Sequence, residues 1–129
     1  MKILVAEDDP ISRNLIEKML SGYGTCTATE NGADALAAFN TALQEGEPYQ
    51  LVCLDIMMPG MDGLECLKAI RASEKERGGA EAKIIMTTAV DTMKSVMDAY
   101  YHGGCNAYLV KPIEPQTLQS TLRDCKLIS

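Results

Sequence analysis

Short, uninterrupted apolar runs alternate along this chain with longer stretches in which apolar residues recur every three or four positions. The runs are typical of strands buried on both faces, and the recurring pattern is typical of amphipathic helices. Five strands are predicted, at Ile3–Ala6, Cys26–Thr29, Leu51–Leu54, Ile84–Met86 and Tyr108–Val110. The second of these runs is the weakest, so we expect it nearer an edge of the sheet.

Amphipathic helices are predicted between and after these strands, five in all. The apolar stripe expected to face the core in the first helix is Ile11, Leu15, Ile16, Met19 and Leu20. Asn31 and Asp62 are suited to cap the next two helices, and Pro115 is suited to the first turn of the last one. The charged stretch Ser73–Arg77 predicts a solvated helix end, and a further helix is predicted around Met93–Tyr100.

Apolar strands that alternate with helices indicate an α/β fold with a doubly wound parallel sheet, covered by helices on both faces. No linker, repeat or low-complexity tract divides the sequence. We therefore expect a single domain over residues 1–129, of the form (βα)5, with no effector domain.

Composition excludes several classes of function. A net charge of −6 with scattered Lys and Arg residues argues against nucleic acid as a partner. The apolar runs are too short for a membrane-spanning helix, so no membrane partner is expected. The single histidine, His102, cannot complete a zinc site with five cysteines that lack paired spacing. We expect those cysteines to be reduced thiols of a cytoplasmic protein.

The residues that follow the predicted strands are polar and chemically related. Glu7–Asp9 follow the first strand, Asp55 the third, Thr87–Thr88 the fourth and Lys111 the fifth. Because parallel strands end at one edge of a sheet, these side chains are predicted to meet there. Crowded carboxylates need a cation or protons to offset their repulsion, and ligand sets made of oxygen alone favour Mg²⁺ or Mn²⁺. A carboxylate nucleophile beside such an ion, a lysine and a hydroxyl is suited to phosphoryl transfer.

The motifs ILVAEDDPISR, LVCLDIMMPGMDG, IIMTTA and YLVKP together resemble those of response-regulator receiver domains, over the length of that family. The resemblance implies a flavodoxin-like sheet with strand order 2-1-3-4-5. It also implies a phosphoprotein of two-component or phosphorelay signalling that catalyses only its own phosphorylation and dephosphorylation.

The resemblance assigns roles to individual residues. Asp55 would be the phosphoacceptor, and Lys111 would pair first with it and then with the phosphoryl group. Thr88 would be the switch hydroxyl, and Tyr108 would be the aromatic switch residue. The magnesium ligands would be Asp8, Asp55, the Met57 carbonyl and, through water, Glu7. Arg13 lies five residues after Asp8, which favours Glu7 and Asp8 as the acidic pair of the family, although Asp8 and Asp9 stay open as the alternative.

The peptide bond between Lys111 and Pro112 is predicted to be cis. The lysine must turn back over the sheet edge directly after a strand, and a cis bond is accessible only before proline. The receiver resemblance implies the same geometry.

The partner implied by the resemblance is a histidine kinase or a histidine phosphotransfer protein, together with an output protein that the sequence does not identify. Two alternatives stay open: a receiver-like interaction module that works without phosphorylation, and the receiver segment of a longer hybrid kinase. A dehalogenase-type phosphatase would need an acid where Met57 stands. A flavodoxin would need a hydroxyl-rich phosphate loop where Glu7–Asp9 stand, so both are disfavoured.

Overall fold

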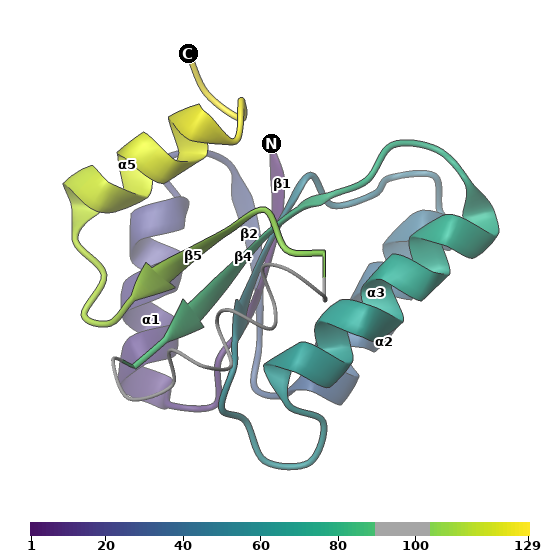
Figure 1. The fold of residues 1–129 in the computed structure, drawn as a ribbon, viewed down its shortest axis with the longest axis horizontal. Helices are drawn as coiled ribbons and strands as arrows, with labels where there is room; N and C mark the ends of the chain where they lie inside the picture. The colour runs from purple at the N-terminus through teal and green to yellow at the C-terminus, as the bar shows by residue number, and fades with distance from the viewer. Residues whose placement is uncertain (90–103) are drawn as a thin grey trace.

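A five-stranded parallel sheet forms the centre of the computed structural model, which describes residues 1–89 and 104–129 (Figure 1). Its strand order is β2-β1-β3-β4-β5, which confirms the predicted α/β fold class and strand order. The described elements, in chain order, are β1 (Lys2–Ala6), α1 (Pro10–Leu20), β2 (Thr25–Thr29), α2 (Gly32–Gln44), β3 (Leu51–Asp55), α3 (Gly63–Arg77), β4 (Lys83–Thr88), β5 (Ala107–Val110) and α5 (Pro115–Asp124). The predicted helix around Met93–Tyr100, and His102, lie outside the described residues.

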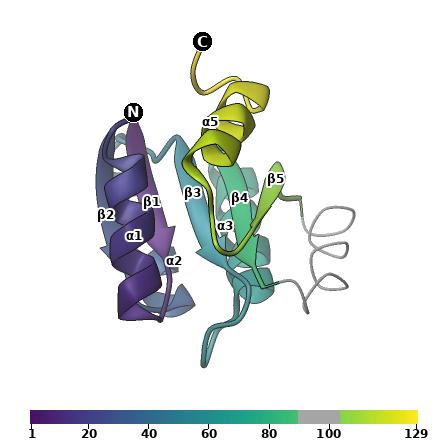
Figure 2. The same ribbon diagram turned by 90° about the vertical axis from the view of Figure 1, so that its left-hand side faces the viewer.

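Helices cover both faces of the sheet, with α1 and α5 on one face and α2 and α3 on the other (Figures 1 and 2). Alternate residues of each strand point to opposite faces, so the sheet separates two apolar clusters. One cluster joins Leu4 and Val52 to Phe39, Leu67 and other residues of α2 and α3. The other joins Ile3, Val5, Leu51 and Ile85 to Ile16, Leu20, Leu118 and Leu122 of α1 and α5.

The register of the sheet brings the carboxyl ends of its strands together. Ala6 pairs with both Thr29 and Leu54, and Asp55 pairs with Thr87. Thr88 in turn pairs with Val110, the residue before Lys111. The polar residues that follow these strands therefore share one edge of the sheet, as the sequence predicted.

Side-chain caps fix where three helices begin. The side chains of Asp9, Asn31 and Asp62 accept hydrogen bonds from backbone N–H groups in the first turns of α1, α2 and α3, respectively. The Asn31 and Asp62 caps were predicted, as was Pro115 at the first turn of α5. Since β2 and β5 lie at the two edges of the sheet, the expectation for the second strand is also confirmed.

The prediction for α1 is wrong at two positions. Ile11 is 79% exposed and Leu15 is 48% exposed, whereas Ile16 and Leu20 are buried. The reason is helix geometry: Ile16 and Leu20 form one stripe, and Ile11 and Leu15 form a second stripe about 100° away around the helix axis. Only the first stripe faces the sheet.

The predicted solvated end of α3 holds for Lys75–Arg77, which are exposed, but Glu74 within the same charged stretch is buried. Glu74 lies on the same helix face as Leu67 and Ile70, so helical spacing turns it inward. Its carboxylate accepts hydrogen bonds from the Ala82 amide at 2.6 Å and from the Arg71 guanidinium at 2.6 Å. Arg71 thereby compensates the buried charge and ties α3 to the start of β4.

The five cysteines are free thiols; Cys26 is half-buried and the other four are buried, which agrees with the expected reduced state. Among the helices that the structure describes, none combines the length and apolar character needed to cross a membrane.

We expect a methyl group at Gly63 to destabilise the fold. The added Cβ would lie 2.3 Å from the carbonyl oxygen of Asp55, a backbone atom that cannot turn away. Gly63→Ala should therefore lower the free energy of unfolding by about 2 kcal/mol, as overpacking of a tight interior does. The matched control is Gly22→Ala, whose Cβ would meet nothing closer than the Met19 carbonyl oxygen at 3.8 Å. Urea titration measures both; equal stabilities would contradict the prediction.

Candidate functional site

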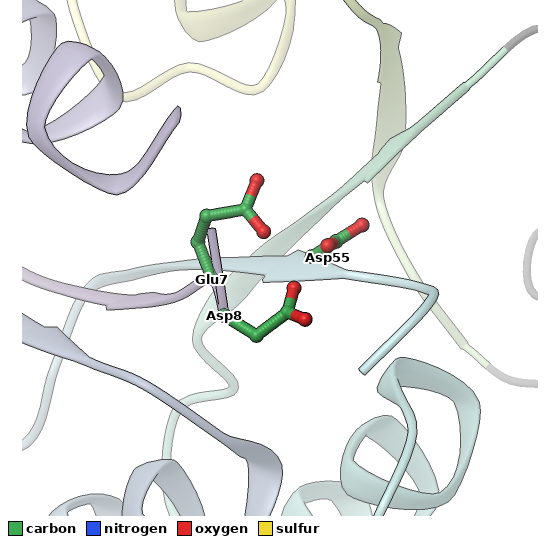
Figure 3. A group of neighbouring side chains, drawn as sticks. All are labelled: Glu7, Asp8 and Asp55. Atoms are coloured by element: carbon green, nitrogen blue, oxygen red, sulfur yellow. The ribbon is translucent and has the colours of Figure 1, made fainter. Parts of the chain in front are cut away.

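Three carboxylates from two strands meet at the carboxyl edge of the sheet. Glu7 follows β1 directly and is fully buried, Asp8 is exposed, and Asp55, the last residue of β3, is 5% exposed. One oxygen of each lies within 4.8 Å of one oxygen of the others. Figure 3 shows the three side chains extending into the same space from the ends of the two strands.

Lys111 brings a positive charge to these carboxylates from the end of β5. Its ammonium group donates a hydrogen bond to Glu7 Oε1 and lies 3.3 Å from Asp55 Oδ2. The backbone N–H of Lys111 donates to the Thr88 carbonyl at 2.8 Å, which anchors the residue to β4. The Lys111–Pro112 bond is cis, as predicted.

The cluster shifts the proton affinities of its members. Burial raises the pKa of Glu7, and the neighbouring Asp55 raises it further, while Lys111 opposes both. Burial by itself would lower the pKa of Lys111, but the Glu7 and Asp55 carboxylates raise it above the usual value. Lys111 is therefore charged at neutral pH, and a proton or a further cation can offset the negative charge that remains.

The carboxylate of Asp9 does not belong to this cluster and has a structural role, although the Asp9 amide lies 3.5 Å from Glu7 Oε2. Its carboxylate accepts a hydrogen bond from the Ser12 amide at 2.9 Å and so caps α1. This bond lowers the pKa of Asp9. The geometry thus groups Glu7 and Asp8 with Asp55, and favours that assignment over Asp8 and Asp9.

The remaining predicted site residues differ in their contacts and in their burial. The Met57 amide lies 3.4 Å from Asp55 Oδ1, while the Met57 side chain is 63% exposed. Thr88 ends β4, is buried, and donates its hydroxyl to the Ala89 carbonyl at 3.0 Å. Tyr108 lies on β5 opposite Met86 and is 39% exposed.

The loop between β3 and α3 is held by a contact that sequence reasoning missed. A Cβ on Gly32, the first residue of α2, would lie 2.6 Å from the Met61 carbonyl oxygen. The Cys66 thiol donates to the Gly32 carbonyl at 3.5 Å. The start of α2 therefore packs closely against the loop that carries Met57. Gly32 is the one residue in the sequence that indicates such a close approach, because any side chain there would collide with the loop.

The donor set fits a hard divalent cation. All three converging ligand atoms are carboxylate oxygens, the type that Mg²⁺ and Mn²⁺ prefer, and no sulfur or imidazole from the described residues joins them. Asp55 is a buried carboxylate with an ammonium group at its side. This combination can hold a cation and present a carboxylate nucleophile to an incoming anionic group.

The comparisons with known proteins agree in family and in fold. A family model described as response regulator receiver domain matches residues 3–123. The sensor histidine kinase GacS of Pseudomonas protegens is 37% identical over 118 residues, which cover 91% of this chain but only 12% of that protein. A chemotaxis protein CheY homolog of Campylobacter jejuni is 33% identical over 126 residues, which cover 96% of this chain and 91% of that protein.

One solved structure combines a similar fold with a partner. It is the co-crystal structure of the histidine phosphotransfer signaling protein Ypd1 with the receiver domain of its downstream response regulator Ssk1, from Saccharomyces cerevisiae. The match has a TM-score of 0.81 at 24% identity and covers 96% of this chain and 87% of that chain. This likeness establishes the shared fold.

We expect Mg²⁺ to stabilise the protein by offsetting repulsion among the three carboxylates. At a concentration one hundred times its dissociation constant, a ligand adds about 2.7 kcal/mol to the free energy of unfolding. Thermal denaturation with increasing Mg²⁺ should show a Tm that rises by several degrees, and Asp8→Asn should reduce this rise. Glu76→Gln, which changes an exposed acid on α3, is the control and should keep it. A Tm that does not respond to Mg²⁺ would contradict the site.

Proposed function

Because the chain belongs to the response regulator receiver domain family, we propose that Asp55 is the residue that accepts the phosphoryl group. Receiver domains are phosphoacceptors of two-component and phosphorelay systems rather than enzymes that act on other substrates. The observation that carries the assignment is Asp55 itself, a buried carboxylate 3.3 Å from the Lys111 ammonium group and beside two further acids.

The proposed reaction is an in-line displacement at phosphorus. An oxygen of Asp55 attacks, the bond from phosphorus to the donor nitrogen or oxygen breaks, and an acyl phosphate forms. Lys111 neutralises charge on the phosphoryl oxygens, and the Thr88 hydroxyl is available to donate to one of them. Hydrolysis of the acyl phosphate by water then restores Asp55, so the chain catalyses only the gain and loss of its own phosphoryl group.

The residues that would hold the divalent cation are Asp8 and Asp55, with the carbonyl of Met57, and with Glu7 through water. The cation, Mg²⁺ or Mn²⁺, would supply positive charge beside the transferring phosphoryl group. Glu7 contributes differently from the other ligands, since its buried carboxylate also receives the hydrogen bond of Lys111. It thus holds the lysine at the site in the absence of a phosphoryl group.

Thr88 and Tyr108 are proposed as the switch. In the unphosphorylated protein the Thr88 hydroxyl is bonded to the Ala89 carbonyl, so donating to a phosphoryl oxygen requires it to turn. Tyr108 is part-exposed on the adjacent strand β5 and can respond to the space that Thr88 leaves. The resulting change in surface around β5 would alter binding to an output protein.

The proposed phosphodonor is a histidine kinase or a histidine phosphotransfer protein, docked on α1. Ile11 and Leu15 expose apolar surface there, although the sequence pattern predicted them to be buried. Leu15 also lines a groove of about 280 Å³ that includes Lys111 and Pro112, so the apolar surface reaches the site itself. The Ypd1–Ssk1 complex supports a partner of this class.

The relatives are consistent with two kinds of protein to which this receiver domain could belong. The CheY homolog is matched over nearly its whole length, whereas the match to the sensor histidine kinase covers a small fraction of that protein. A diffusible regulator and the receiver segment of a longer kinase therefore both fit, with the same site chemistry. The acidic net charge supports a protein rather than nucleic acid as the output partner, and the free thiols support a cytoplasmic location.

Phosphorylation at Asp55 is tested with a small phosphodonor. Incubation with acetyl phosphate and Mg²⁺ should add one base-labile phosphoryl group per chain, measured by intact mass. Asp55→Asn and removal of Mg²⁺ should each abolish the gain. Asp62→Asn is the matched control, because asparagine can also cap α3. Labelling of Asp55→Asn would refute the assignment, and a wild-type chain that is never labelled would favour the phosphorylation-independent module.

Docking on α1 is tested by Ile11→Ser. Loss of an apolar anchor should slow transfer from a phosphorylated histidine phosphotransfer protein about tenfold, which corresponds to roughly 1.4 kcal/mol. Labelling by acetyl phosphate should not change, since that donor needs no docking surface. Ala37→Ser, at an exposed position of α2, is the control. Equal transfer rates for Ile11→Ser and wild type would place the docking surface elsewhere.

A further inference from the structure

Arg13 reaches back from α1 to the backbone of the two acidic residues. Its Nη1 donates a hydrogen bond to the Glu7 carbonyl at 3.0 Å and lies 3.4 Å from the Asp8 carbonyl. Its Nη2 lies 3.7 Å from Glu30 Oε1, and 17% of its side chain is exposed. One guanidinium group thus spans the turn that presents both carboxylates.

The sheet does not supply these contacts. The regular register of β1 ends at Ala6, and the last backbone bond on this side is from the Glu7 amide to the Thr29 carbonyl at 3.1 Å. Beyond it, the Asp9 side chain is engaged in capping α1. The carbonyls of Glu7 and Asp8 therefore lie past the ladder, and Arg13 holds them in place.

We propose that Arg13 is a positioning residue for the cation site. By fixing the carbonyls of Glu7 and Asp8, it sets the direction in which their carboxylates leave the chain, toward Asp55. Arg13 touches neither the phosphoryl group nor the cation in this role. The inference rests on the proposed function of the acidic cluster, and it extends that function to a residue outside the cluster.

The charge of Arg13 and its backbone contacts are expected to affect the affinity for Mg²⁺ in opposite directions. A guanidinium near the cluster repels a divalent cation, so removing its charge should by itself tighten Mg²⁺ binding. Loss of the backbone contacts should weaken binding, because the carboxylates are no longer held in one direction. Partners that orient the ligands of a metal typically change its affinity by roughly tenfold or more.

The experiment is calorimetric titration of Mg²⁺ into the full chain and three variants. Arg13→Met, which keeps a long side chain without donors or charge, should weaken binding roughly tenfold. Arg13→Lys keeps the charge but lacks the planar fork, so it should weaken binding less. Glu30→Gln removes only the ion pair and should leave the dissociation constant within about twofold, because exposed ion pairs contribute little.

Amide chemical shifts of Glu7, Asp8 and Asp9 in the absence of Mg²⁺ give a second measurement. They should change in Arg13→Met and stay unchanged in Glu30→Gln, and urea titration identifies any variant that fails to fold. If Arg13→Met fails to fold, Arg13→Lys decides the question through the same two measurements. A wild-type chain that binds Mg²⁺ while the folded arginine variants bind it equally or more tightly would overturn this inference alone. A wild-type chain without Mg²⁺ binding would overturn the proposed function as well.

Discussion

Mutual repulsion of buried carboxylates is the constraint on which the rest of this structure depends. Glu7, Asp8 and Asp55 place oxygens within 4.8 Å of one another, and two of the three side chains are almost entirely removed from water. Three carboxylates stay this close together only where an opposite charge is near and where the backbone that carries them is rigid. Lys111 supplies the charge, and the tight contacts of Gly63 with Asp55 and of Gly32 with the loop after β3 supply the rigidity.

Repulsion among the carboxylates also explains why residues from several helices hold the backbone around the cluster. The start of α2 presses on the loop after β3 through Gly32, and Gly63 packs against the Asp55 carbonyl. Arg13 holds the turn after β1 from the side of α1. Each support acts on the backbone and leaves the carboxylates free for a ligand. A parallel sheet suits this arrangement, because the carboxyl ends of its strands open onto one edge.

Much of this architecture was predictable from the sequence, and the exceptions have physical reasons. Apolar runs and capping residues predicted the strands and helices, and the residues after the strands predicted which side chains meet at the carboxyl edge of the sheet. Ile11 and Leu15 were misassigned because two adjacent stripes on a helix look alike in a sequence, and only packing decides which one faces the sheet. The burial of Glu74 was missed because it depends on Arg71, whose partners Ala82 and Asn106, just before β4 and β5, are distant in the chain.

The location of Lys111 has a consequence for how this protein loses function. The lysine follows the four-residue strand β5, which lies at the edge of the sheet, while the carboxylates stand on the interior strands β1 and β3. Edge strands open at lower free energy than interior strands, through local fraying rather than global unfolding. Separation of β5 from β4 would move the ammonium group away from the carboxylates on the interior strands. In the proposed function, phosphoryl transfer would therefore depend on the stability of this edge strand, and heat or denaturant should abolish transfer before the chain unfolds.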